Sequence, residues 1–317
     1  MKPGNDDITV DISAVVPLYN ERESLPELTN TVRESLLSTG RSFEMIFIDD
    51  GSTDGSFEAL LDLKKSVPEM RIIQLQKNHG KSAALSTGFA YARGEFVVTI
   101  DADLQDDPKE IPALLKKLDE GYDLVSGWKK NRQDPFSKKI TSKFFNLVTS
   151  FTTRTYLHDH NCGLKAYRRS VIEHLFIYGQ LHRFMPSLAH SNGFRVTEVV
   201  VTHHQRKYGK TKYGFWRFFA GFFDLLTVLY LTKFTTRPLH LFGSIGLVSF
   251  LTGFFINLHL TIRKYFYHEG VSNRPLLFLG ILLILIGIQS FSLGLLAEMI
   301  TNIRSRDKKY VIKNIYD

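Results

Sequence analysis

The most constraining stretch of the chain is an apolar run that ends abruptly in acidic residues, FVVTIDADLQDDP over residues 96–108. The β-branched and aromatic residues at its start predict a buried strand of a parallel sheet over 96–100. Side chains alternate along an extended chain, so Asp101 and Asp103 are expected to project to the same side. The carboxyl end of such a strand is where open α/β sheets bind their ligands.

Two converging carboxylates repel each other unless a cation lies between them. A hard divalent ion can do this, and Mg²⁺ typically combines one or two carboxylates with substrate phosphates. The first hypothesis is therefore a metal site that holds a diphosphate. The alternative is a solvated acidic turn, in which Asp106 and Asp107 cap a helix whose first turn contains Pro108. The D-x-D pattern alone favours the second interpretation, and its surroundings favour the first.

Strand and helix patterns alternate along the first part of the chain. This order predicts βαβ units and an α/β domain with a mostly parallel sheet. Further strands are predicted over 123–126 and 196–202, and an amphipathic helix suited to a membrane surface over 138–153. The alternating elements are strands at 12–17, 43–48, 71–75 and 96–100, with helices at 24–38, 56–65, 82–92 and 110–120.

Polar loops follow three of these strands and, in a doubly wound sheet, meet at one edge. They contain Asn20-Glu21, Asp49-Asp50 and the D-x-D segment. Carboxylates there can accept hydrogen bonds from the N–H and O–H groups of a base and a ribose. For residues 52–54, a turn with a helix cap and direct ligand contact are both open. Neither G-x-G-x-x-G nor G-x-x-x-x-G-K-[ST] occurs, so neither a dinucleotide fold nor a P-loop kinase is supported.

Composition narrows the class of partner and the compartment. The formal net charge of +8 fits nucleic acid, anionic lipid or phosphate-bearing substrates. The single cysteine, Cys162, allows no internal disulfide and fits a reducing compartment. The N-terminus MKPGNDD is polar and shows no cleavable signal peptide, whereas apolar residues concentrate in the last third and indicate a membrane.

Four blocks together resemble the nucleotide-sugar-binding half of family 2 inverting glycosyltransferases: VVPLYNE, FIDDGSTDGS, NHGKSAALSTGFAYARGE and IDADLQDDP. The resemblance implies a GT-A fold and a nucleotide diphosphate sugar as donor. It implies that Asp101, Asp103 and Gln105 hold Mg²⁺ or Mn²⁺ against the diphosphate, with Asp103 counted among the catalytic groups. The residues that it places at the nucleotide sugar are Pro17, Tyr19, Glu21, Asp50, Lys81, Asp101 and Ala102.

The block LHDHNCGLKAYRRSV and the HRF-x-P element at 182–186 resemble the polyprenyl-phosphate glycosyltransferases within that family. In that subgroup the acid at the Asp159 position lies near the transferred sugar and the acceptor. His158 and His160 flank this position and would point apart in an extended chain, so a metal site there is not expected. Cys162 reads as an inert small residue rather than a reactive thiol.

Basic residues follow in two places. The segment 203–213 interleaves them with aromatic side chains, which could bind RNA. It also resembles the subgroup's H-x-x-R-x-x-G-x-(S/T)-K-(Y/F) stretch, which favours Arg206, Lys210 and Lys212 as ligands of a lipid phosphate. A nonspecific membrane-surface patch is the rival interpretation, and no nucleic-acid partner is expected. The loop 128–132 would bring Lys129 and Arg132 to a phosphate, or would be merely solvated.

Two long uncharged runs, 238–262 and 275–297, each exceed the ~20 residues needed to cross ~30 Å of hydrocarbon. We expect two spanning helices rather than a buried hairpin. Charges interrupt the preceding apolar segment 214–237, which favours an interfacial helix. Glycines in the spans would allow close helix contact or a homo-oligomer. The expected organisation is a catalytic domain at 1–213, the interfacial segment at 214–237, the spans at 238–303 and a basic tail at 304–317.

The basic tail places both termini and the catalytic domain in the cytoplasm. The expected reaction moves one hexose, from a UDP-glucose-like donor, to a polyprenyl phosphate such as undecaprenyl phosphate, with inversion. A phosphate monoester is largely dianionic at pH 7 and needs no general base, so Asp159 would position the acceptor or stabilise charge on the sugar. The rivals are a family 2 enzyme with a polysaccharide or glycolipid acceptor, although Q-x-x-R-W is absent, and a non-catalytic membrane scaffold.

Overall fold

The chain divides into two compact units, Met1–Val228 and Leu229–Asp317, and each is treated by itself. The structure is a computed structural model. It describes residues 10–130, 150, 155, 157–205, 207, 227, 230, 234, 238–267 and 275–305. The interfacial segment expected at 214–237, the amphipathic helix expected at 138–153 and the basic tail lie almost entirely outside the described residues.

Within the described part of the first unit, seven strands form one sheet in the order β3-β2-β1-β4-β6-β5-β7. The neighbouring pairs β3–β2, β2–β1 and β1–β4 are parallel, and β5 is parallel to β7. Strand β6 runs antiparallel to both β4 and β5. The sheet is therefore mostly parallel, as the sequence predicts, with one reversed strand beside β4. The strands are β1 Val10–Leu18, β2 Phe43–Asp49, β3 Met70–Gln74, β4 Gly94–Thr99, β5 Leu124–Trp128, β6 Lys165–Arg168 and β7 Val196–Val200.

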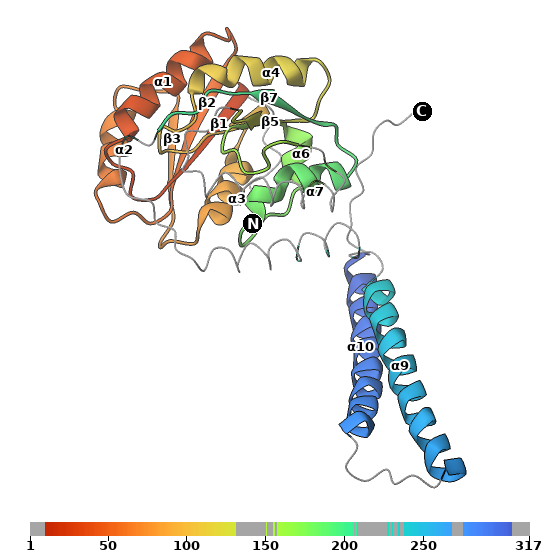
Figure 1. Ribbon diagram of the computed structural model, residues 1–317. Helices are drawn as coiled ribbons and strands as arrows, with labels where there is room; N and C mark the ends of the chain where they lie inside the picture. Colours follow the sequence, from red (N-terminus) through yellow and green to blue (C-terminus); the bar gives the residue numbers. More distant parts are fainter. Residues whose placement is uncertain are drawn as a thin grey trace. The chain divides into compact units, whose positions relative to one another are not determined.

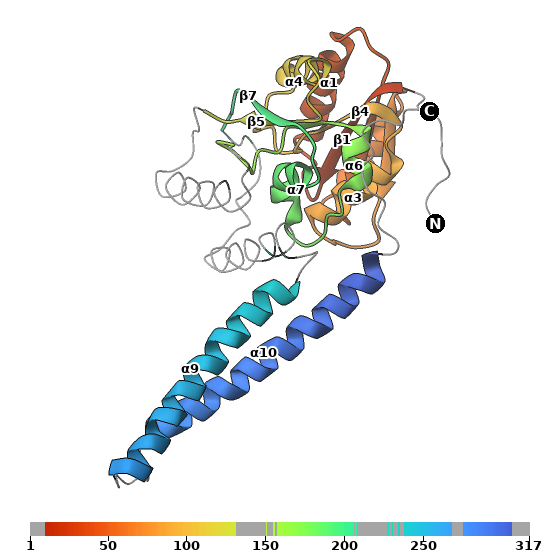
Figure 2. The same cartoon turned by 90° about the vertical axis from the view of Figure 1, so that its right-hand side faces the viewer.

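Helices cover both faces of this sheet (Figure 1). Figure 2 shows α1 and α4 on one face and α3, α6 and α7 on the other. Buried apolar side chains of β1, β2 and β4 form the core between these layers, and Ile12, Val16 and Phe47 have no exposed surface. The helical elements are α1 Leu25–Leu37, α2 Ser56–Lys64, α3 Lys81–Tyr91, η1 Pro108–Glu110, α4 Ile111–Asp119, α6 Arg169–His174, η2 Leu181–Phe184 and α7 Met185–Ser191.

Strand β6 was not predicted. Its four residues, KAYR, contain no apolar run, and they become a strand because they pair on both sides. Thr99 at the end of β4 pairs with Lys165 at the start of β6, and Ser126 of β5 pairs with the same lysine. This register brings the loop before β6, residues 161–164, beside the carboxyl end of β4.

The chain after β4 turns, whereas the sequence predicted that it continues as an extended strand through Asp101 and Asp103. The strand ends at Thr99, and residues 102–103 form a turn rather than an extended continuation. Leu104 has a φ of 57°, in the left-handed region that reverses the chain direction. The alternation expected for Asp101 and Asp103 therefore does not apply. The capping alternative holds for Asp107, whose side chain accepts a 3.0 Å hydrogen bond from Lys109 N at the start of η1.

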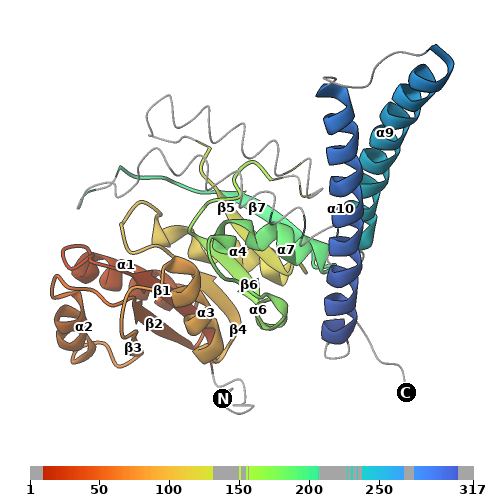
Figure 3. The ribbon, with the colours of Figure 1, turned by 90° about the horizontal axis from the view of Figure 1, so that it is seen from below.

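The second unit contains two long apolar helices, α9 (Pro238–Tyr267) and α10 (Pro275–Ser305), which lie side by side (Figure 3). Each contains an 18-residue stretch of high mean hydropathy, 1.8 in α9 and 2.5 in α10, and these values and the helix lengths suit membrane spans. A Cβ on Gly253 would lie 2.5 Å from Gly280 O, and one on Gly287 would lie 2.7 Å from Gly246 O. These pairs show that the helices run antiparallel and that the span glycines allow close backbone approach, as predicted.

Helix α3 packs against the sheet through a glycine, which gives a test of the fold. A Cβ on Gly88 would lie 2.4 Å from Val15 Cγ1 and 2.8 Å from Ile48 Cδ1. Gly88→Ala gains about 1 kcal/mol of helix propensity. Overpacking typically costs about 1–3 kcal/mol and outweighs that gain. We expect a lower midpoint of thermal unfolding in detergent. Ser86→Ala on the exposed face of α3 is the matched control and should leave the midpoint nearly unchanged.

Candidate active site

The loops after β1 and β2 are bonded to each other at the carboxyl edge of the sheet. Asn20 N donates to Ser52 Oγ at 2.9 Å, and Thr53 N donates to Asn20 Oδ1 at 2.8 Å. Asn20 adopts a φ of 54°, which Asn tolerates better than most residues. The expectation that these strand-end loops meet is confirmed. Ser52 and Thr53 bond one loop to the other, which agrees with the interpretation of residues 52–54 as a turn.

Asp50 organises the loop that leads into α3. Its carboxylate is 3% exposed and accepts 2.8 Å hydrogen bonds from both His79 N and Gly80 N. The neighbouring Gly51 has a φ of 71°, and a Cβ there would lie 2.6 Å from the Lys77 carbonyl carbon. The loop after β2 and the loop before α3 can therefore approach this closely only with glycine at position 51. Through this contact Asp50 fixes the start of α3, where the side chain of Lys81 emerges.

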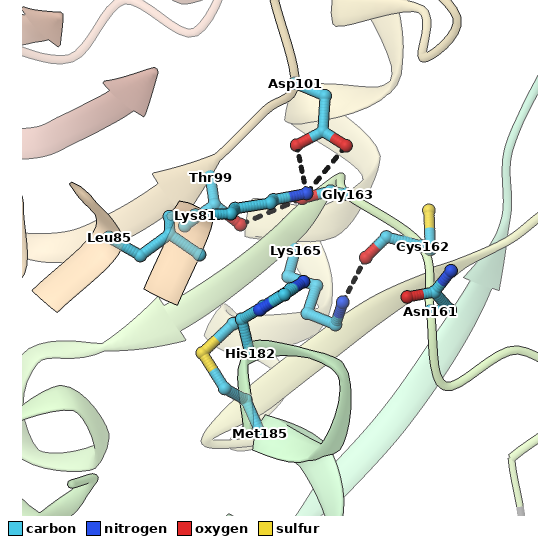
Figure 4. A pocket seen from close by; sticks show the side chains of 10 residues that line it. All are labelled: Lys81, Leu85, Thr99, Asp101, Asn161, Cys162, Gly163, Lys165, His182 and Met185. Carbon is cyan, nitrogen blue, oxygen red and sulfur yellow. Dashed lines mark hydrogen bonds and ion pairs between the residues drawn. The ribbon is translucent and has the colours of Figure 1, made fainter. Parts of the chain in front are cut away.

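Lys81 and Asp101 form the central ion pair of the site. Lys81 Nζ lies 2.5 Å from Asp101 Oδ1 and 2.7 Å from Oδ2 (Figure 4). Burial alone would raise the pKa of Asp101, but Lys81 outweighs it and, with Lys129 and Lys165, lowers that pKa to about 2. A Cβ on Gly163 would lie 2.5 Å from the Asp101 carboxylate. The Asp101 carboxylate therefore fills the space that any larger residue at position 163 would need.

The turn that follows joins the end of β7. Asp103 Oδ1 accepts a 3.2 Å hydrogen bond from Gln105 N. Gln105 O in turn accepts from His204 N at 2.9 Å and lies 3.1 Å from His203 Nδ1. His204 Nε2 lies 3.2 Å from Asp107 Oδ2. The basic segment predicted to bind phosphate therefore begins at the D-x-D turn.

A second ion pair, between Lys129 and Asp106, lies next to this turn. Lys129 Nζ, at the end of β5, lies 2.6 Å from Asp106 Oδ1, and the two side chains are 12% and 1% exposed. Burial alone would lower the pKa of Lys129, but the Asp106 carboxylate outweighs it and raises that pKa. Asp106 is thus a buried partner of Lys129 rather than a helix cap, because the fold places Lys129, the residue after β5, beside it.

A pocket opens between Asp101 and the segment that follows β6 (Figure 4). Lys165 forms part of its wall and is only 2% exposed. Its Nζ donates to Cys162 O, and burial lowers its pKa. His182 contributes from η2 and Met185 from α7, so residues remote in sequence meet here. The lining residues are Lys81, Leu85, Thr99, Asp101, Asn161, Cys162, Gly163, Lys165, His182 and Met185.

Asp159 lies two residues before Asn161, which lines the pocket. It is 1% exposed, and its Oδ1 accepts a 3.0 Å hydrogen bond from Asn161 N. The flanking histidines diverge: His158 stacks on Trp128 with ring centroids 4.0 Å apart, whereas His160 is buried, 3.0 Å from Ser150 Oγ. Burial lowers the pKa of His160 to about 4.

Cys162 is buried at the pocket wall, and burial raises the pKa of its thiol. A raised thiol pKa means little thiolate near neutral pH, and thiolate is the nucleophilic form. Cys162 therefore has the properties of an inert small residue, as expected from the sequence.

Residues 13–176 match the model of glycosyl transferase family 2. The chain belongs to that family. This glycosyltransferase is 38% identical to a dodecaprenyl-phosphate galacturonate synthase of Rhizobium johnstonii, over 99% of this chain and 95% of the relative. It is 37% identical to an undecaprenyl-phosphate 4-deoxy-4-formamido-L-arabinose transferase of Salmonella paratyphi B, over 96% of this chain and 94% of the relative.

Solved structures support the fold of this family 2 enzyme. A mannosyltransferase of Pyrobaculum calidifontis in complex with GDP-Man and Mn²⁺ aligns with a TM-score of 0.53 at 18% identity, over 96% of this chain and 78% of that one. A glucosyl-3-phosphoglycerate synthase of Mycobacterium tuberculosis in complex with Mn²⁺, UDP-glucose and phosphoglyceric acid aligns with a TM-score of 0.53 at 20% identity, over 73% and 85%. The predicted GT-A fold is thereby confirmed.

The structure brings together part of the predicted site of this glycosyltransferase. Lys81, Asp101, Ala102, Asp103 and Gln105 lie at one turn or its neighbouring helix, and Pro17, Tyr19, Glu21 and Asp50 lie at the adjoining strand ends. Arg132, Arg206, Lys210 and Lys212 lie outside the described residues. Asn161, Lys165 and His182 were not predicted, although the last two stand in the CGLK and HRF-x-P motifs; their burial around a pocket depends on tertiary contacts.

Gly163 offers a test of the site without removing a charged group. Gly163→Ala places a methyl group against the Asp101 carboxylate and should displace it from Lys81. We expect glycosyltransferase activity to fall by about tenfold or more, because small displacements of positioning groups are costly. Gly243→Ala is the matched control, since its Cβ would meet nothing closer than Leu239 Cδ1 at 3.5 Å. Unchanged activity of Gly163→Ala would show that the Asp101 position is unimportant.

Proposed function

We propose that this family 2 glycosyltransferase transfers one sugar from a nucleotide diphosphate sugar to a polyprenyl phosphate, with inversion at the anomeric carbon. The observation that carries the proposal is the near full-length similarity to two curated relatives whose names specify polyprenyl-phosphate acceptors. The intact ion-paired acidic turn at the carboxyl edge of the sheet supports a catalytic rather than a scaffold role.

For the donor we propose a uridine diphosphate sugar, with glucose as the first candidate. Galacturonate and 4-formamido-arabinose, the sugars named for the relatives, are the next candidates. Pro17, Tyr19, Glu21 and Asp50 would form the nucleotide end of the site, and Lys81 and Ala102 would lie at the diphosphate. The bonded loops after β1 and β2 support this assignment, because they hold these residues at one edge of the sheet.

For the metal we propose Mg²⁺ or Mn²⁺, held by Asp101, Asp103 and Gln105. The donor set fits: two carboxylates and an amide oxygen are hard ligands on a single turn, and Asp101 already faces a cation, Lys81. The described residues contain no cluster of three or more His, Cys, Asp or Glu that would enclose a metal, so phosphate oxygens would complete the coordination. When bound, the metal would act as a Lewis acid that stabilises the departing diphosphate.

For the acceptor we propose that Arg206, Lys210 and Lys212 bind the lipid phosphate, with Arg132 nearby. Lys129 was also predicted to bind this phosphate, but it is 12% exposed and its charge is compensated by Asp106. The start of that basic segment is anchored at the D-x-D turn by His203 and His204, and Lys207 pairs with Glu27 of α1. A phosphate monoester has a second pKa near ~6 and is already nucleophilic at pH 7. Cations need only orient it, so we assign Asp159 to acceptor positioning or to charge stabilisation on the sugar.

We propose a location at the cytoplasmic membrane, with two spans formed by α9 and α10. Both helices are long and apolar enough to cross a bilayer. The domain boundaries proposed from the sequence place catalysis in 1–213, and the basic residues of the tail favour cytoplasmic termini. Nucleotide sugars and a reducing environment are both found on that side.

The reaction can be tested directly with purified protein in detergent. We expect a single monoglycosyl-phosphate lipid, identified by mass spectrometry, when the enzyme meets undecaprenyl phosphate, Mn²⁺ and one of UDP-glucose, UDP-galacturonate or the UDP-linked formamido-arabinose. Omission of the lipid is the control. Release of nucleotide onto a sugar acceptor, with no lipid product from any donor, would replace this proposal by a polysaccharide- or glycolipid-forming activity.

The metal assignment has its own test. Asp103→Asn should lower kcat by about 100-fold or more, because loss of electrostatic stabilisation of a leaving group typically has this effect. The fold should persist, since Asn matches Asp in size and its Oδ1 can still accept the 3.2 Å hydrogen bond from Gln105 N. Asp62→Asn, at a 75% exposed side chain, is the control and should retain full activity. Near-normal turnover of Asp103→Asn with saturating Mn²⁺ would contradict the assignment.

A further inference from the structure

Glu198 lies in the middle of β7, and the proposed mechanism gives it no role. It is the one charged residue in the strand sequence VTEVV. Its side chain is only 15% exposed. Glutamate is rarely buried without a partner, because removal of a carboxylate from water is costly. The groups that compensate this carboxylate therefore indicate what Glu198 does.

Both oxygens of the Glu198 carboxylate contact one residue, His158. Oε2 accepts a 2.9 Å hydrogen bond from the backbone N–H of His158. Oε1 accepts from Nδ1 of the same residue. An ionised carboxylate has no hydrogen to donate, so Nδ1 carries a proton in this contact. Hydrogen bonds to a charged acceptor are among the stronger ones, and these two hold the main chain and the ring of His158 together.

The His158 ring is also held by the neighbouring strand. It stacks on Trp128, the last residue of β5, with ring centroids 4.0 Å apart and an interplanar angle of 14°. Strands β5 and β7 are parallel neighbours, and Ser126 of β5 stands opposite Glu198 in their register (Figure 3). His158 is therefore attached to both strands of this pair.

Asp159 follows His158 directly and is held from the same two strands. Ser126 Oγ donates to the carbonyl oxygen of Asp159 at 3.4 Å. Glu198 binds the backbone N–H of the residue before it. The main chain is thus held on both sides of the Asp159 Cα, and the direction of a side chain follows from the position of its main chain. The buried Asp159 carboxylate is oriented by contacts that begin at Ser126 and Glu198.

We propose that Glu198 is a positioning residue for sugar transfer, which sets the place of the Asp159 carboxylate by holding His158 through two hydrogen bonds. This inference rests on the proposed function, because the role of Asp159 at the acceptor or the sugar is assigned there. The contact joins residues 40 positions apart in the chain, so no local motif contains both partners.

Two variants separate the position of the Glu198 side chain from its charge. Glu198→Gln loses the charge but keeps its reach: its oxygen can accept from the His158 backbone, and its N–H₂ can donate to Nδ1 once the ring proton is on Nε2. Glu198→Asp keeps the charge but is one methylene shorter, so either the contact breaks or the loop moves with it. Glu173→Ala, at a 56% exposed side chain of α6, is the control.

Turnover is measured in detergent with undecaprenyl phosphate, Mn²⁺ and the UDP-sugar that the wild type uses. We expect Glu198→Asp to lower kcat about tenfold, since small displacements of positioning groups are costly, and Glu198→Gln to stay within about threefold of the wild type. Calorimetric affinity for UDP should stay within about twofold in both variants, because the nucleotide end lies at other strand ends. Higher activity of the Asp variant than of the Gln variant, or an equal loss of UDP affinity, would overturn the inference.

A double-variant cycle tests whether Glu198 acts through Asp159. In the Asp159→Asn background no carboxylate remains to be positioned, so Glu198→Asp should lower kcat by less than about twofold. A further tenfold loss there would show an independent role and overturn the inference. If the double variant is too slow to measure, the order of the two single variants decides. A wild type that forms no glycosyl-phosphate lipid would refute the proposed function, and this inference with it.

Discussion

Two lysine–carboxylate pairs hold the carboxyl edge of the sheet together. Lys81 neutralises Asp101 from α3, and Lys129 neutralises Asp106 from the end of β5. Removing one partner of a buried pair such as Lys129–Asp106 typically costs about 3–5 kcal/mol, because the other charge is left without compensation. The acidic turn therefore depends on cations from two separate elements. The loop before β6, the end of β7 and the start of α3 are all arranged around it.

Two neighbouring parts of the site contain different kinds of chemical group. The strand-end loops and the acidic turn present carboxylates and backbone amides, such as the Asp50 carboxylate that accepts from His79 N and Gly80 N. The pocket beside them combines one carboxylate, one buried lysine and a neutral histidine with apolar side chains. Neutrality of His182, whose pKa burial lowers to about 2, matters here, because Lys81 and Lys165 already supply positive charge, and a third cation would add to the repulsion.

Much of this structure follows from local sequence patterns. The strands and helices of residues 10–120 follow apolar periodicity and glycine or proline boundaries, and the structure has them within a few residues of the prediction. Strand β6 could not be found in this way, since KAYR has no apolar run and is defined by pairing with β4 and β5. The left-handed Leu104, which ends the extended chain, also has no local signal, because leucine rarely adopts that conformation.

The candidate site likewise contains residues that a local sequence motif identifies and residues that only tertiary contacts bring to the site. Asp101, Asp103 and Gln105 are visible as one short motif, whereas Lys165 and His182 gain their setting from contacts across the fold. The alternative interpretation of Asp106 as a helix cap is wrong, because its partner, Lys129, is more than twenty residues away in sequence and meets it only in the folded sheet. Patterns of adjacent residues identify a turn, but burial of a polar side chain depends on what the tertiary structure places beside it.

The position of β6 has a consequence for synthesis on the ribosome. Strand β5 leaves the ribosome before β6, yet β6 lies between β5 and β4 in the finished sheet. Strand β5 thus has no neighbour on the β4 side until residues 165–168 have emerged, and β7 joins only on its far side. All of these strands precede α9, which begins at Pro238. The whole sheet is therefore translated before α9 and can assemble in water before that apolar helix is complete.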